Sequence, residues 1–63
     1  MKLYIYDERT RDVVAIAEGV DKQECESKAV RANYDDMDRY GWTYSPSFGN
    51  ACGIFETDNH EKL

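Results

Sequence analysis

The sequence predicts an α+β protein in which a four-stranded antiparallel sheet carries one helix on one face, in the order β-β-α-β-β. Three observations lead to this prediction. Residues 2–6 alternate in character, a polar stretch separates them from a second apolar run, and a capped helical pattern follows. One antiparallel sheet with the helix on one side is the simplest arrangement for that order of elements.

The first two strands are predicted to form an antiparallel hairpin. Leu3 and Ile5 alternate with Lys and Tyr side chains, a period-two pattern that is typical of a strand. Residues 7–12 are all polar and have the length of a hairpin connection, and residues 13–17 form an apolar second strand. The second strand shows no clear alternation, so its register stays open.

Residues 20–34 are predicted to form the only long helix. Asp21 is a favourable N-cap because its carboxylate can accept hydrogen bonds from the free N–H groups of the first turn. Glu24, three residues later, completes the pattern of a capping box, and Val20 and Cys25 have the spacing of a hydrophobic staple. The start of the helix is therefore well defined by its sequence.

The body of this helix carries a narrow apolar face of small side chains, which favours close packing on a sheet. The face consists of Cys25, Ala29 and Ala32. Two C-terminal ends are open. The helix stops near Asp35, or it continues through Met37 to Tyr40 and ends at Gly41 as a left-handed terminator.

The C-terminal half is predicted to supply the other two strands. Residues 42–44 form the third strand, which Pro46 ends because proline cannot donate a hydrogen bond within a sheet. Residues 45–53 then form a loop, and residues 54–57 form a short fourth strand. The single small domain spans residues 1–57, and residues 58–63 form a flexible polar tail.

Size and charge restrict the classes of function. A domain of 63 residues buries only about 60% of the surface of its unfolded chain, so a partner subunit is a plausible source of further stability. Thirteen acidic against eight basic residues give a net charge of −5, and the bases are scattered, which argues against direct binding to nucleic acid or to anionic membranes. Without a signal peptide pattern or a long apolar run, we expect a cytoplasmic protein.

Catalytic and metal-binding patterns are weak. Cys25 and Cys52 are expected to be free thiols, with Cys25 a small core residue rather than a nucleophile. The only histidine, His60, lies in the predicted tail, and its spacing from the cysteines matches no zinc site. We therefore expect neither an enzyme nor a protein with a metal or another cofactor.

The aromatic residues suggest a binding surface. Five tyrosines, two phenylalanines and one tryptophan exceed what a thin core between one helix and one sheet would usually hold. We expect an exposed aromatic patch on the face without the helix, formed by Tyr4, Tyr6, Trp42 and Tyr44. The alternative stays open that residues 45–53 and the tail cover this face, or that Trp42 belongs to the core.

Two segments carry a resemblance to known proteins. Residues 2–7, KLYIYD, and residues 40–49, YGWTYSPSFG, resemble segments of small uncharacterised proteins encoded by tailed phages and prophages of bacteria. The resemblance implies a bacterial cytoplasmic accessory protein that acts by binding. It implies no catalytic residues.

Two hypotheses about function follow. The first is a non-enzymatic protein-protein interaction module, of phage or prophage origin, that uses the aromatic face to form a homodimer or to bind a host protein. The second is an acidic decoy that imitates nucleic acid and inhibits a nucleic-acid-binding host protein. Its contact residues would be Asp35, Asp36 and Asp38.

Overall fold

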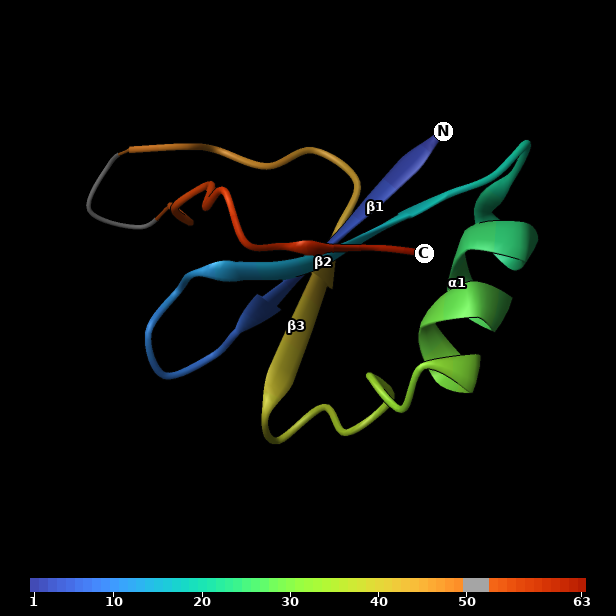
Figure 1. Cartoon of the computed structure of the whole chain (residues 1–63), viewed down its shortest axis with the longest axis horizontal. Coiled ribbons are helices and arrows are strands. Elements are labelled where there is room, and N and C mark those ends of the chain that lie inside the picture. The colour runs from blue at the N-terminus through green and yellow to red at the C-terminus, as the bar shows by residue number, and fades with distance from the viewer. Residues whose placement is uncertain (50–52) are drawn as a thin grey trace.

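A computed structural model describes residues 1–49 and 53–63 of the chain. It confirms the α+β class, with a four-stranded sheet in the order β3-β1-β2-β4 and one helix, α1, beside it (Figure 1). The strands are β1 (Lys2–Asp7), β2 (Val13–Glu18), β3 (Tyr40–Thr43) and β4 (Glu61–Lys62), and α1 spans Lys22–Arg31.

β1 and β2 form the predicted antiparallel hairpin. In the turn between them, the Asp7 carboxylate accepts hydrogen bonds from the N–H groups of Arg9 and Thr10 at 2.7 and 3.2 Å. These backbone donors hold the pKa of the Asp7 carboxyl below its ordinary value, because they stabilise the charged form. One side chain thus organises the polar turn.

A β-bulge in this hairpin explains why the second strand lacks a clear alternation in sequence. Ile5 lies opposite Ala15, but the next residue, Tyr6, lies opposite Val13, so that Val14 is the extra residue. The inserted residue shifts the alternation of side chains at that point. Val14 consequently packs against the main core cluster.

The predictions of a fully antiparallel sheet and of a fourth strand at residues 54–57 are wrong. β3 pairs antiparallel with β1, but β4 pairs parallel with β2. Ile54 and Phe55 form only isolated bridges, and β4 lies within residues 58–63, the stretch predicted to be a tail outside the domain. A strand of two residues has too little periodicity to be recognised in a sequence.

The N-terminus of α1 has the predicted cap. The Asp21 carboxylate accepts a hydrogen bond from the N–H of Glu24 at 2.9 Å, and the Glu24 carboxylate accepts one from the N–H of Val20 at 3.5 Å. The predicted staple between Val20 and Cys25 is absent, because Val20 is 85% exposed while Cys25 is fully buried. The polar cap, without the staple, therefore marks the start of the helix.

The helix ends at Arg31, earlier than either predicted end. Asn33 adopts a left-handed backbone with φ of 66°, and two backbone hydrogen bonds of 3.0 Å run from Asn33 to Val30 and from Tyr34 to Ala29. This is the hydrogen-bond pattern of a Schellman motif. Asn33, rather than a glycine, is the terminator.

Gly41, predicted as one possible helix terminator, lies instead in β3, opposite Tyr6. A Cβ atom at this position would overlap with the Tyr6 ring, 2.6 Å from Cε2 and closer still to Cζ. The ring thus occupies the space that any side chain at residue 41 would need, which explains the glycine.

The core lies between α1 and the sheet. Its cluster consists of side chains with no exposed surface: Leu3, Ile5, Ala15, Ala17, Cys25 and Ala29. The small residues of the helix allow its backbone to approach the sheet closely. The prediction that Cys25 is a core residue is confirmed, and Cys52 lies outside the described residues.

Candidate functional site

The four aromatic residues predicted to form one patch lie on both faces of the sheet. Trp42 of β3 pairs with Ile5 of β1, and Ile5 is buried beneath α1. Directly opposite residues share a face, so Trp42 and Tyr44 lie on the helix side, whereas Tyr4 and Tyr6 point to the other side. The structure therefore separates the predicted patch into two pairs.

The helix-free face is partly covered, which is one of the alternatives that the sequence leaves open. The Tyr4 ring meets the Phe48 ring edge to face, with ring centroids 5.7 Å apart. Tyr6 lines a small cavity of about 170 Å³ together with Pro46 and Ile54. The loop after β3 thus packs on this face, and both tyrosines are only partly exposed.

On the helix side, hydrogen bonds fix the aromatic residues of β3. The indole Nε1 of Trp42 donates to the Tyr34 carbonyl at 2.9 Å. The hydroxyl of Tyr44 donates to the Glu26 carboxylate of α1 at 2.7 Å. Because their polar atoms are bonded within the chain, these two rings form a fixed wall beside the helix.

A groove runs between this wall and the outer flank of α1. It has a volume of about 460 Å³ and is lined by Gln23, Glu26, Ser27, Val30, Arg31 and Trp42. Val30 is 48% exposed and Trp42 is half-buried, so that the two offer apolar surface between charged side chains. An apolar centre with a polar rim is the arrangement found at protein interfaces. We call this feature the α1/β3 groove.

The groove lies beside the outer edge of β3, which pairs with no other strand among the residues that the structure describes. The N–H of Glu8 donates to the Arg39 carbonyl at 3.0 Å, so these two residues form a hydrogen-bonded pair. Along β1 and β3, such pairs alternate with pairs whose main-chain groups point away from the neighbouring strand. In that alternation, the main-chain N–H and C=O of Trp42 point away from β1. The Tyr40 N–H also points outward, and it donates to the Asp36 carbonyl at 2.9 Å. The outer edge at Trp42 can therefore accept another strand.

The predicted acidic contact residues lie in the turn between α1 and β3, and all three are exposed. Asp36 has a structural role, because its carboxylate accepts a hydrogen bond from the N–H of Asp38 at 3.1 Å. Asp38 lines a depression at the turn between β1 and β2, together with Glu8 and Arg39. The acidic turn thus leads directly into β3, and the Asp36 carbonyl accepts a hydrogen bond from the outward N–H of Tyr40.

Two tyrosines on the helix side donate to carboxylates, Tyr44 to Glu26 and Tyr34 to Glu61 of β4 at 2.8 Å. Burial of the hydroxyls and, after it, these hydrogen bonds raise the pKa of both tyrosines from 10.0 to about 12. A tyrosine whose pKa is higher in the folded state than in the unfolded state contributes to stability, and this contribution is complete at any pH below the unfolded-state pKa. That contribution is lost as the pH rises through the folded value.

We therefore expect the free energy of unfolding to fall between pH 10 and pH 12 as Tyr34 and Tyr44 ionise. Urea denaturation followed by circular dichroism, repeated across this pH range, measures the effect. In a double Tyr34→Phe, Tyr44→Phe variant the fall should be clearly smaller. Equal slopes in the variant and the parent protein would show that these hydroxyls do not contribute.

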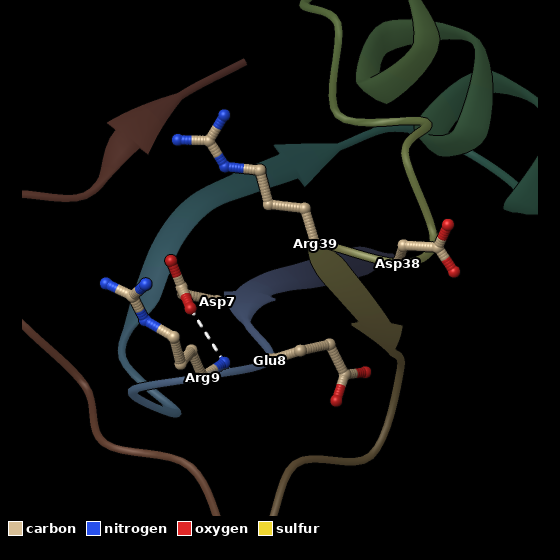
Figure 2. Close-up of a pocket in the computed structure, with 5 residues that line it drawn as sticks. All are labelled: Asp7, Glu8, Arg9, Asp38 and Arg39. Atoms are coloured by element: carbon tan, nitrogen blue, oxygen red, sulfur yellow. Dashed lines mark hydrogen bonds between the residues drawn. The ribbon is translucent and has the colours of Figure 1, made fainter.

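A further depression of the described surface, about 550 Å³, lies at the turn between β1 and β2. Figure 2 shows that its charged side chains point in different directions rather than toward one centre. The lining residues are Asp7, Glu8, Arg9, Asp38 and Arg39. Within residues 1–49 and 53–63, no group of three potential ligands is arranged to hold a metal ion. This depression thus offers no convergent set of catalytic or ligand groups.

Comparison with known proteins gives no relative: no family model, no curated protein and no solved structure matches this chain. In the described part of the chain, no helix has both the length and the apolar character needed to cross a membrane.

Sequence reasoning identified Trp42 and Tyr44 but missed Val30. The sequence does contain a signal for Val30, because it is a branched apolar residue that lies outside the face formed by Cys25, Ala29 and Ala32.

Proposed function

We propose that this protein is a non-enzymatic protein-protein interaction module that binds its partner at the α1/β3 groove. The observation that carries the proposal is that an unpaired strand edge, the half-buried Trp42 and the exposed Val30 lie together. Strand addition supplies main-chain hydrogen bonds, and tryptophan is among the residues that contribute most to interface energy. In this proposal Tyr4 and Tyr6 do not contact the partner. They pack on the opposite face of the sheet, against the segment that follows β3.

The resemblance of residues 2–7 and 40–49 to small phage and prophage proteins supports a role as a phage or prophage accessory protein in the bacterial cytoplasm. Such a protein acts by binding a host protein or by assembling with itself. The sheet edge and the groove suit either partner, since main-chain pairing needs no particular sequence in the added strand.

Two matched substitutions test the proposal. Val30→Asp places a charge inside the groove, whereas Val20→Asp places the same charge at an 85% exposed site just before α1. We expect Val30→Asp to weaken partner binding about tenfold or more, because it desolvates a carboxylate at the interface. Val20→Asp should bind like the parent protein.

Binding is measured by light scattering for self-association and by quantitative capture from bacterial lysate for host proteins, after circular dichroism has shown that both variants are folded. Equal binding by the Val30→Asp and Val20→Asp variants, whether retained or lost, would contradict a partner site in the α1/β3 groove.

A second candidate function is the acidic decoy, which is favoured by the exposure of Asp35, Asp36 and Asp38 in one turn. Binding by such a decoy would weaken steeply with salt, because it depends on charge. It would also survive Val30→Asp and be lost when Asp35 and Asp38 are both changed to asparagine. This combination of results distinguishes the decoy from the α1/β3 groove.

A further inference from the structure

We infer that the occupant of the α1/β3 groove is a second copy of this chain, joined by antiparallel pairing of the two β3 strands about a two-fold axis at Trp42. The inference rests on the proposed function, because it names the partner at the same surface. The reason for the inference is that the α1/β3 groove and the β3 edge match the same surface of a second copy in main-chain hydrogen bonds, in apolar side chains and in charge.

The main-chain groups of β3 fit this arrangement. The outward N–H and C=O of Trp42 can form reciprocal hydrogen bonds with the same groups of Trp42 in the second copy. The same pairing sets Tyr40 opposite Tyr44 of the second copy. There the outward Tyr40 N–H is already bonded to the Asp36 carbonyl, so the main-chain pairing is confined to Trp42. This pairing joins the two sheets at Trp42 and covers the open part of each β3 edge.

The side chains beside the axis are apolar. Directly opposite residues share a face of the sheet, so both Trp42 rings come together on the helix side. Each ring borders the groove of about 460 Å³ that contains Val30, and the two grooves face each other across the axis. Pairing thus covers the exposed apolar surface of both copies at once.

The charges favour the antiparallel arrangement. The acidic turn that contains Asp35 and Asp38 precedes β3, and Lys22 lies at the other end, with its Nζ 5.4 Å from the centroid of the Tyr44 ring. Antiparallel pairing brings the acidic turn of each copy toward Lys22 of the other and keeps the two acidic turns apart. Parallel pairing would bring the two acidic turns together, at a cost in electrostatic repulsion.

The test compares two charge reversals in the full chain. Lys22→Glu removes the proposed partner of the acidic turn, and it should not harm folding because a carboxylate is favourable in the first turn of a helix. Lys62→Glu makes the same change of net charge in β4, at the opposite edge of the sheet. Light scattering across a concentration series gives the dissociation constant of the dimer for each variant.

We expect a dimer of about twice 7.3 kDa for the parent chain. Its dissociation constant should be raised about tenfold or more by Lys22→Glu and changed little by Lys62→Glu. Adding Asp35→Lys and Asp38→Lys to the Lys22→Glu variant should recover association.

Equal weakening by Lys22→Glu and Lys62→Glu, or failure of the added lysines to recover association, would overturn the antiparallel pairing. A chain that stays monomeric at every concentration would overturn the inference as a whole. The proposed function would still stand in that case if a host protein bound the parent chain and not the Val30→Asp variant.

Discussion

Replacing Ile5 by alanine is expected to lower the free energy of unfolding by about 2–5 kcal/mol, the range for removing a large aliphatic side chain from a packed core. Ile5 is fully buried in β1, which has strands on both sides and α1 above it. At about 0.05–0.15 kcal/mol per residue, a chain of this length has little stability to lose. The variant should therefore populate the unfolded state strongly at room temperature.

Urea denaturation, followed by circular dichroism and by tryptophan fluorescence, measures this loss. Val30→Ala serves as the control, since it removes an aliphatic side chain at a site that is 48% exposed and should change stability by only about 0.5 kcal/mol. A loss of less than about 1 kcal/mol for Ile5→Ala would be inconsistent with the core between α1 and the sheet.

Gly41→Ala is expected to lower the free energy of unfolding by about 1–3 kcal/mol, although alanine adds only one methyl group. The new Cβ would overlap with the outer atoms of the Tyr6 ring. Tyr6 can yield only toward the small cavity that it lines together with Pro46 and Ile54, which belong to the segment after β3. The strain therefore falls on both β3 and the loop that follows it.

A double-mutant cycle isolates this contact. Tyr6→Leu removes the distal ring atoms that the new Cβ would meet, so in that background Gly41→Ala should cost less than about 0.5 kcal/mol. The coupling between the two positions is obtained from urea denaturation of the four proteins. Additive effects would mean that the close approach of Tyr6 to Gly41 does not limit residue 41.

Local patterns predicted the elements whose causes are local. The hairpin follows from the alternation around Leu3 and Ile5, together with a polar turn that Asp7 organises through backbone hydrogen bonds. The start of α1 follows from the capping residue Asp21. The close packing of the helix follows from the small side chain of Ala29, among others.

The features that the sequence did not predict depend on contacts between distant segments. The parallel pairing of β4 with β2 is held by main-chain hydrogen bonds, such as that from Leu63 to Ile16 at 2.9 Å, which leave no side-chain pattern. The face of Trp42 depends on its register with Ile5, far away in the chain. The sequence offers both Asn33 and a later glycine as helix terminators, and the left-handed backbone of Asn33 shows which of the two ends the helix.

The candidate site shows the same division. From the composition we expect aromatic residues and an acidic turn to serve in binding. The structure places Trp42 and Tyr44 on the helix side of β3 and the acidic turn between α1 and β3. Tyr4 and Tyr6 lie on the other side because successive residues of a strand face opposite ways. Val30 joins the site only through the position of α1 beside β3.

Trp42 is the only tryptophan in the sequence, so its fluorescence reports directly on the α1/β3 groove. The most direct measurement is acrylamide quenching of Trp42 while light scattering records association on the same samples. If a partner binds in this groove, the quenching constant should fall in proportion to the bound fraction, and the emission should shift to shorter wavelength. Association with unchanged quenching would show that the partner binds elsewhere, contrary to the proposed function.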